Sequence, residues 1–177
     1  LMRTLRGKVV LVTGAASGIG RCLAMRFAQA GSLVLITDVD GDRAVRLAAE
    51  VQASGGLARA YVLDVTDVEQ VRQLRTRLSD DTGGIDVLVN NAGVVHGGAF
   101  LDVALERHLA TFMVNTIGVT TMTHVFLGDL LVRHEAHVVN MASASSLVGL
   151  PFGASYASSK WAVLGLSESL RLELKAL

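Results

Sequence analysis

The sequence has a single cysteine, Cys22, and a single proline, Pro151. One cysteine cannot form a disulfide within the chain, and we expect a reducing, cytoplasmic environment. Cys22 falls in an apolar helical pattern, which predicts a small buried side chain. No run approaches the roughly 20 apolar residues that a membrane helix needs. We therefore expect no membrane association.

An excess of charge of one sign is also absent, because 16 Lys and Arg residues balance 16 Asp and Glu residues. This balance provides no general attraction for nucleic acid, which we do not expect as a partner. The histidines of the segment 134–137 are three residues apart, not the four of an H-E-x-x-H zinc motif. We expect a turn there and no metal. His96 and His108 are isolated in the sequence.

Hydrophobic residues, in contrast, make up 51% of the 177 residues, and charged residues only 18%. This composition favours a sheet that is buried on both faces. The length predicts one domain, residues 1–177.

Short β-rich runs alternate with helical segments along the chain. Strands are expected at 8–13, 33–37, 59–63, 85–89 and 137–141, and helices at 19–30, 42–53, 68–78, 105–133 and 156–177. Such alternation is typical of a parallel sheet with right-handed crossovers. We predict an α/β fold with a doubly wound, Rossmann-like sheet in three α/β/α layers and strand order 3-2-1-4-5. Gly31 is expected to end the first helix in a left-handed conformation.

A glycine-rich turn, residues 13–20, lies between the first strand and the first helix, with glycines at 14, 18 and 20. Small residues allow a pyrophosphate to approach the backbone, and the amino end of a helix favours its negative charge. A tight turn without a ligand is the alternative. Asp38 closes the second strand, near the position at which an acidic group binds an adenosine ribose. Asp40 and Asp42 are rivals for that role, and each could instead be a turn or cap residue.

Tyr156 and Lys160 lie four residues apart in the last predicted helix and therefore share a face. An ammonium group close to a phenol favours the phenolate, which can accept a proton in general acid–base catalysis. An ordinary amphipathic surface pair is the alternative.

Together these motifs resemble those of the short-chain dehydrogenase/reductase family. The matching segments are Thr13-Gly14-x-x-x-Gly18-Ile19-Gly20, Asn90-Asn91-Ala92-Gly93 and Tyr156-Ala157-Ser158-Ser159-Lys160, with Ser143 at the family spacing before the tyrosine. The resemblance covers essentially the whole chain. It departs from the family at Ala142, where many members have a serine, and at Leu177, where they continue into further strands and a substrate lid. We therefore expect a fold that is incomplete at its C-terminus.

The resemblance implies roles for individual residues. Tyr156 would be the general acid/base, Lys160 would also hold the nicotinamide ribose, Ser143 would bind the substrate oxygen, and Asn115 would support a proton-carrying water chain. The implied cofactor contacts are Gly14, Ser17, Gly18, Ile19, Gly20, Asp38, Asp64, Val65, Asn91, Ala92, Gly93, Tyr156 and Lys160.

These expectations define an oxidoreductase that transfers a hydride between NAD and a small to medium apolar secondary alcohol or ketone. A carboxylate at Asp38 favours NAD over NADP, because NADP has a phosphate on this ribose. An NADP-dependent carbonyl reductase and a non-catalytic redox sensor remain alternatives. The resemblance also implies a homo-oligomer, a dimer or tetramer, because family members pair the fourth and last helical segments across a two-fold axis. The apolar residues of these segments are Phe112, Met113, Ile117, Trp161, Leu164 and Leu166, some of which must instead face the sheet.

Overall fold

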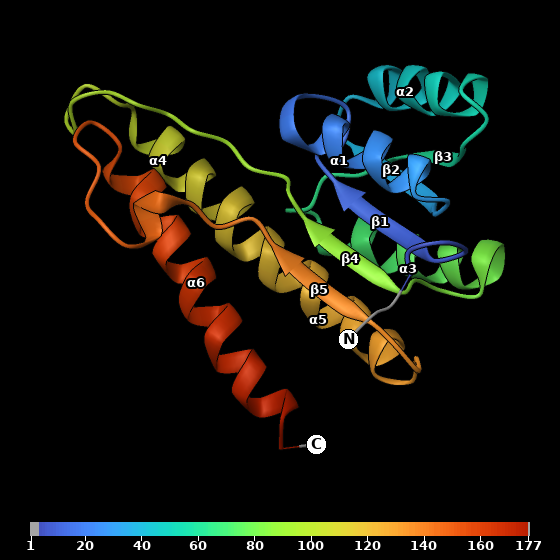
Figure 1. Ribbon diagram of the computed structural model, residues 1–177. Coiled ribbons are helices and arrows are strands. Elements are labelled where there is room, and N and C mark those ends of the chain that lie inside the picture. Colours follow the sequence, from blue (N-terminus) through green and yellow to red (C-terminus); the bar gives the residue numbers. More distant parts are fainter. Residues whose placement is uncertain (1–3, 177) are drawn as a thin grey trace. The chain divides into compact units, whose positions relative to one another are not determined.

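Five parallel strands form one sheet in the computed structural model, which describes residues 4–176 (Figure 1). The strands are β1 (Val9–Thr13), β2 (Leu33–Asp38), β3 (Leu57–Val62), β4 (Val87–Asn90) and β5 (His137–Asn140), in the order β3-β2-β1-β4-β5. The predicted order and the Rossmann-like α/β class are confirmed, with helices on both sides of the sheet.

Six α-helices alternate with the strands in the described chain: α1 (Gly18–Gln29), α2 (Gly41–Ala53), α3 (Val68–Thr82), α4 (Leu105–Phe112), α5 (Val119–Leu131) and α6 (Ala154–Leu174). A π-helical segment, η1 (Met113–Gly118), separates α4 from α5, and a 3₁₀ turn, η2 (Ala144–Ser146), precedes α6. The predicted helix at 105–133 is thus three segments. The prediction for the last helix extended to Leu177, which lies outside the described residues.

The described chain divides into two compact units. The first contains the residues up to 92 together with 121–139, and the second contains 93–120 together with the residues from 140 onward. The single domain inferred from the sequence stays a prediction.

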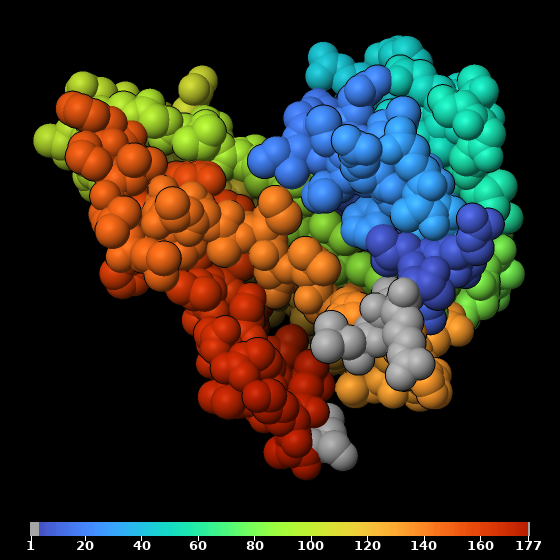
Figure 2. Space-filling view, viewed as in Figure 1, coloured from blue at the N-terminus to red at the C-terminus, as the bar shows by residue number. Residues whose placement is uncertain are grey.

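The core of the first unit explains why the central strands are continuous apolar runs. Val10, Leu11 and Val12 of β1 have no exposed surface, although neighbouring side chains of a strand point to opposite faces of the sheet. Helices therefore cover both faces, as a parallel sheet requires. In the space-filling view, the side chains of α1 (blue) and α2 (cyan) lie against one another (Figure 2).

Cys22 contradicts its prediction, because it is exposed. The buried positions of α1 are Gly20, Ala24 and Ala28, which recur every four residues on one face. Cys22 follows Gly20 by two residues and so lies on the opposite side of the helix. Gly31, in contrast, has the predicted left-handed conformation, with φ of +86°. Gly31 N donates to Ala28 O at 2.9 Å, and Ser32 N donates to Phe27 O at 3.1 Å.

Within residues 4–176, no helix is long and apolar enough to cross a membrane. No group of three or more His, Cys, Asp or Glu side chains in this range is placed to hold a metal ion. Residues 133–135 form a bend between α5 and β5.

Candidate active site

The glycine-rich turn of the first unit uses its three glycines in different ways. A Cβ atom on Gly14 (φ +59°) would lie 2.7 Å from the Cα of Ala92, and one on Gly20 would overlap Gly14 O and the Asn91 amide. These two glycines allow the turn to pack against the end of β4. A Cβ on Gly18 (φ +53°) would have no atom within 4 Å. Gly18 alone of the three borders open space.

Asn91 and Ala92 join the end of β4 to this turn. The Asn91 side chain donates to Thr13 O at 2.9 Å and to Gly14 O at 3.0 Å. The hydroxyl of Thr13 accepts from the backbone amides of Asn91 at 3.1 Å and Ala92 at 3.0 Å. Both Asn91 side-chain donors are therefore used to brace the turn. The sequence motif includes Thr13 but indicated no separate role for it, although its position at the end of a strand was an available signal.

The amino end of α1 lacks the neutralising groups found on α2 and α3. Ser17 precedes the helix without a side-chain capping bond, and the first turn has no acidic residue. Asp40 caps α2 by accepting from Arg43 N at 3.0 Å, and Asp67 caps α3 by accepting from two amides. The first amides of a helix have no partner within it, so α1 offers donors and a positive dipole end to an anion.

Asp38 lies directly beside the glycine-rich turn. Its Oδ2 accepts from Ala16 N at 2.9 Å and its Oδ1 from Asp40 N at 3.1 Å. These bonds fix the carboxylate at the carboxyl end of β2. Asp40 is occupied as the cap of α2, and Asp42 lies within its first turn.

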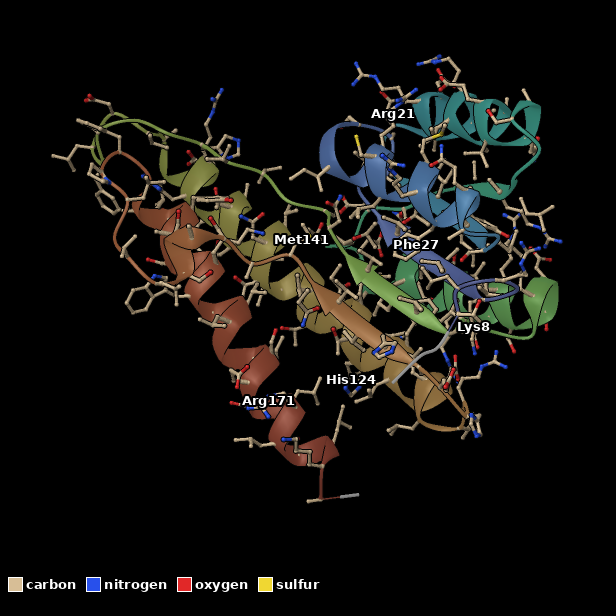
Figure 3. The ribbon with its side chains drawn as sticks, viewed as in Figure 1. Lys8, Arg21, Phe27, His124, Met141 and Arg171 are labelled. Atoms are coloured by element: carbon tan, nitrogen blue, oxygen red, sulfur yellow. The ribbon has the colours of Figure 1, made fainter. Side chains whose placement is uncertain are left out.

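Arg21 of α1 and Arg43 of α2 both form ion pairs. Arg21, labelled in Figure 3, forms an exposed ion pair with Glu50, and Arg43 lies 3.1 Å from Asp40. Neither guanidinium is left unpaired for a ribose phosphate.

Asp64 and Val65 follow β3. The Asp64 carboxylate accepts from the backbone amide of Thr66 at 2.9 Å and from its hydroxyl at 2.7 Å, which stabilises a turn. Val65 is buried. Their predicted contacts with a cofactor stay predictions.

The second unit brings Tyr156 and Lys160 together on α6. Lys160 is 5% exposed, and its Nζ lies 5.8 Å from the centroid of the Tyr156 ring. The same Nζ donates to the carbonyl of Met141, labelled in Figure 3, at 2.7 Å. Burial disfavours the charged ammonium and lowers the pKa of Lys160. A lysine held in this way gives up a proton more readily than an exposed one.

Asn115 is completely buried within the π-helical segment. Its Oδ1 accepts from Val94 N at 2.8 Å, and its amide group donates to Val94 O at 2.9 Å and to Ser159 Oγ at 3.0 Å. The side chain thus ties the segment after β4 to α6. π-helical turns inside α-helices are frequent at functional sites.

Ser143 precedes the turn η2, and its hydroxyl accepts from Ser145 N at 3.1 Å. This leaves the hydroxyl proton of Ser143 free to be donated. Ser146, which sequence reasoning missed, accepts from Ser143 N at 3.2 Å and donates to Lys160 O at 2.8 Å. Ser143 and Lys160 therefore belong to one hydrogen-bonded network.

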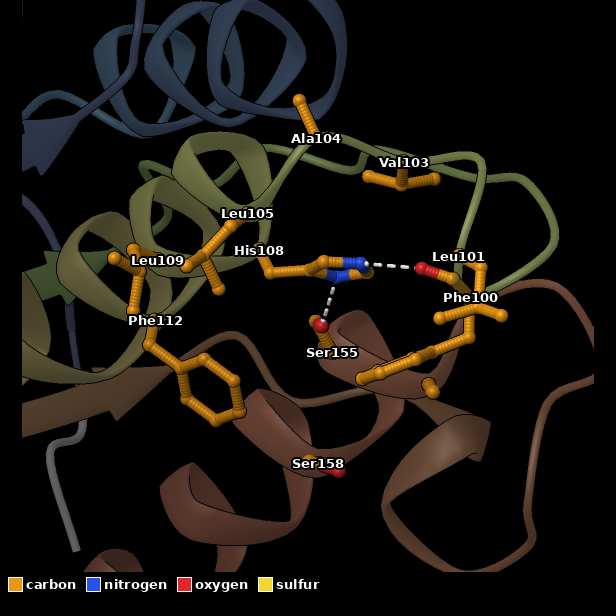
Figure 4. Close-up of a pocket in the computed structure, with 11 residues that line it drawn as sticks. Phe100, Leu101, Val103, Ala104, Leu105, His108, Leu109, Phe112, Ser155 and Ser158 are labelled. Atoms are coloured by element: carbon orange, nitrogen blue, oxygen red, sulfur yellow. Dashed lines mark hydrogen bonds between the residues drawn. The ribbon is translucent and has the colours of Figure 1, made fainter.

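An apolar cavity of about 610 Å³ adjoins the first turn of α6 (Figure 4). His108 Nε2 lies 3.0 Å from Phe100 O, and its Nδ1 lies 2.5 Å from the hydroxyl of the buried Ser155. A carbonyl only accepts, so Nε2 donates and Nδ1 accepts from Ser155. The ring also stacks on Phe100 at 4.7 Å. His108 thereby anchors the residue that precedes Tyr156.

His96 and His108 are isolated in the sequence, but both form hydrogen bonds in the structure. His96 Nδ1 lies 3.1 Å from the hydroxyl of Thr111, which donates its own proton to Arg107 O. The bonds of His96 to Thr111 and of His108 to Ser155 join residues 15 and 47 positions apart, so spacing gave no signal for them.

A family model described as short chain dehydrogenase matches residues 8–177. This chain belongs to the short-chain dehydrogenase family. A 1-deoxy-11-beta-hydroxypentalenate dehydrogenase of Streptomyces exfoliatus is 42% identical over 174 residues, which are 97% of this chain and 63% of that protein. Human 17-beta-hydroxysteroid dehydrogenase 13 is 33% identical over 99% of this chain and 58% of its own length. The chain thus spans about three fifths of these relatives.

Two solved structures of the family have the same fold. A short-chain dehydrogenase/reductase from Burkholderia phymatum, in complex with NAD, has a TM-score of 0.94 and 34% identity over 99% of this chain and 63% of its own. A metagenomic short-chain oxidoreductase, in complex with NADP, has a TM-score of 0.91 and 30% identity over 97% of this chain and 78% of its own. Both cofactors therefore occur among these neighbours.

Proposed function

We propose that this protein is an oxidoreductase that transfers a hydride between NAD and a secondary alcohol or ketone. The observation that carries the proposal is the buried Lys160, whose Nζ lies 5.8 Å from the Tyr156 ring centroid. The names of two relatives, a hydroxypentalenate dehydrogenase and a hydroxysteroid dehydrogenase, are consistent with oxidation of an alcohol.

The first unit fits the dinucleotide. The open space at Gly18 and the uncapped amino end of α1 suit a pyrophosphate, and the fixed carboxylate of Asp38 suits a ribose with two hydroxyls. The bound nicotinamide would supply the acceptor or donor of the hydride. We propose further contacts from the remaining predicted residues: Gly14, Ser17, Ile19, Gly20, Asp64, Val65, Asn91, Ala92 and Gly93.

The second unit would contain the residues that transfer the hydroxyl proton of the substrate. In alcohol oxidation, the Ser143 hydroxyl would hydrogen-bond the substrate oxygen and Tyr156 would accept the hydroxyl proton. Lys160 would favour the phenolate by its charge, hold the ribose and pass protons onward. Asn115 would hold the segment around Val94 in place, because both its donors and its acceptor are used there and on Ser159.

Turnover tests this function directly. The natural full-length protein should reduce NAD with a panel of secondary alcohols, and oxidise NADH with the matching ketones, followed by nicotinamide absorbance and fluorescence. A redox sensor would instead bind NAD, with a change in fluorescence, and convert none of the substrates. Binding without turnover across the panel would overturn the enzymatic proposal.

We also propose a homo-oligomer with two-fold symmetry. Leu105, Leu109, Met113 and Ile117 recur every fourth residue along α4 and η1, and all four are exposed. Such a stripe on one helical face is typical of a surface that another protein covers.

Light scattering at micromolar concentration should therefore give the mass of a dimer or tetramer. Leu109→Asp should shift the protein toward the monomer, because a carboxylate in an apolar interface loses its hydration without gaining a partner. Val132→Asp is the matched control, since Val132 is equally apolar and 84% exposed outside the stripe. A monomer in the wild type, or equal dissociation by both variants, would contradict this interface.

A further inference from the structure

Two loops of the second unit lead into the proposed catalytic residues. One comprises residues 93–104, which precede α4, and the other comprises residues 141–153, which contain Ser143 and end at α6. Gly98 N donates to Phe152 O at 2.8 Å, so the loops are joined. Asp102 is the only acidic or basic residue in either loop, apart from the imidazole of His96.

Large apolar side chains of both loops are exposed. They are Val95, Phe100, Leu101, Leu147, Val148, Leu150 and Phe152. Seven such residues on two joined loops form a patch rather than scattered apolar residues, and patches of this kind mark binding surfaces. The second loop contains Ser143 and ends shortly before Tyr156, and the first loop is hydrogen-bonded to it. A small molecule that reacts at these residues is therefore the occupant we consider.

Phe152 has a strained backbone within this patch. Its φ is +60°, the only positive value at a non-glycine residue among residues 4–176. The hydrogen bond to Gly98 holds its carbonyl, and the next residue, Gly153, lies so close to Leu150 that a Cβ would be 2.6 Å from that side chain. The Phe152 ring is 71% exposed, so burial within residues 4–176 does not offset this strain. Strained residues of this kind cluster at ligand-binding sites.

From these observations we propose that the paired loops recognise a bulky, uncharged, apolar alcohol or ketone, with Phe152 as the residue that determines this specificity. The proposal rests on the function proposed above. A charged substrate group would lose its hydration against these loops without finding a partner, which disfavours hydroxy acids and phosphate-bearing thioesters. A bulky apolar substrate would cover the Phe152 ring and gain a contact that residues 4–176 do not make.

Steady-state kinetics of the natural full-length protein test this proposal with Phe152→Gly. Glycine adopts a positive φ without strain, so this variant removes the ring and keeps the loop. For 4-tert-butylcyclohexanone we expect kcat/KM to fall about tenfold or more, mainly through KM, whereas for acetone it should change less than about twofold. Asparagine also tolerates a positive φ, so Phe152→Asn should show the same fall in kcat/KM for the bulky ketone. Val132→Gly, in a turn outside the patch, is the control.

Three results would overturn the proposal. One is a kcat/KM for a keto acid of similar size that equals that of the neutral ketone. Another is an equal loss for acetone and for the bulky ketone. The third is a change of oligomeric state in Phe152→Gly by light scattering, which would assign the loops to contacts between copies of the chain.

Calorimetric titration with 4-tert-butylcyclohexanone separates this proposal from the proposed function. Binding by the wild type that Phe152→Gly weakens, without turnover of any ketone, would refute the oxidoreductase and support the recognition surface. Turnover of acetone without measurable binding of the bulky ketone would support the oxidoreductase and refute the recognition surface.

Discussion

Replacement of Tyr156 by Phe is expected to lower kcat by a factor of about 10²–10⁴, the usual contribution of a general acid or base. The Lys160 ammonium lies 5.8 Å from the centroid of the Tyr156 ring, and a phenylalanine ring retains this contact. The substitution therefore removes the hydroxyl and little else. Cofactor affinity should change little, because the proposed ribose contact of Lys160 remains.

The chain contains a matched control for this experiment. Its only other tyrosine, Tyr61 on β3, donates to Asp81 at 3.1 Å. Tyr61→Phe also removes one phenol and should leave kcat close to that of the wild type. Stopped-flow turnover for kcat and fluorescence titration for the cofactor Kd provide the two readouts. A Tyr156→Phe enzyme that keeps most of its kcat would show that another group transfers the proton.

The sheet could be predicted from the sequence because each of its signals is local. Buried runs such as Val9–Thr13 and Leu33–Asp38 are short, apolar and rich in β-branched residues, and glycines end the intervening helices. Errors occurred where local signals were weak. β3 begins two residues before the predicted start, at Leu57, and α3 continues past residue 78 until Gly83 ends it with φ of +70°.

The motif residues were identifiable from the sequence, but their physical tasks were not. The resemblance implies that Gly14, Gly20 and Asn91 contact a cofactor, which stays a prediction. The structure adds that the two glycines let the glycine-rich turn pack against the end of β4 and that Asn91 donates to this turn. These contacts arise because β1 and β4 are neighbours in the sheet although about eighty residues separate them in the chain. Only the strand order reveals such contacts.

The hydrogen-bond networks around the proposed catalytic residues were also invisible in the sequence. Ser146 links the turn of Ser143 to Lys160, and His108 anchors Ser155 immediately before Tyr156. Histidine and serine at these positions carry no periodic signal, and their bonds join segments between 14 and 47 residues apart. The sequence therefore identifies the motif residues but not their long-range hydrogen-bond partners.

Wild-type protein is expected to prefer NAD over NADP by at least about a hundredfold in kcat/KM, which needs only about 2.7 kcal/mol. The phosphate of NADP carries nearly two negative charges at neutral pH. At about 4 Å from the Asp38 carboxylate, each like-charge pair costs on the order of 4 kcal/mol at an effective dielectric constant near 20. Solvent and side-chain movement reduce this cost, but a preference of the expected size remains.

The structure adds two reasons why this repulsion should persist. Hydrogen bonds from Ala16 N and Asp40 N hold the Asp38 carboxylate in place, so it cannot simply turn away. Arg21 and Arg43, the cations that could bind the phosphate, are paired with Glu50 and Asp40. An NADP-selective enzyme would need at least one of these arginines to leave its partner.

The measurement is the ratio of kcat/KM for NAD to that for NADP, in the wild type and in Asp38→Asn and Asp38→Ala. Both substitutions remove the charge, and because they also disturb the turn at Ala16, the ratio rather than either absolute value is the readout. We expect the ratio to fall at least about tenfold in both variants, since tenfold corresponds to only about 1.4 kcal/mol. Asp42→Ala, which removes an exposed carboxylate in the first turn of α2, should leave the ratio unchanged. Equal use of both cofactors by the wild type would show that Asp38 does not face the ribose, and would favour an NADP-dependent carbonyl reductase.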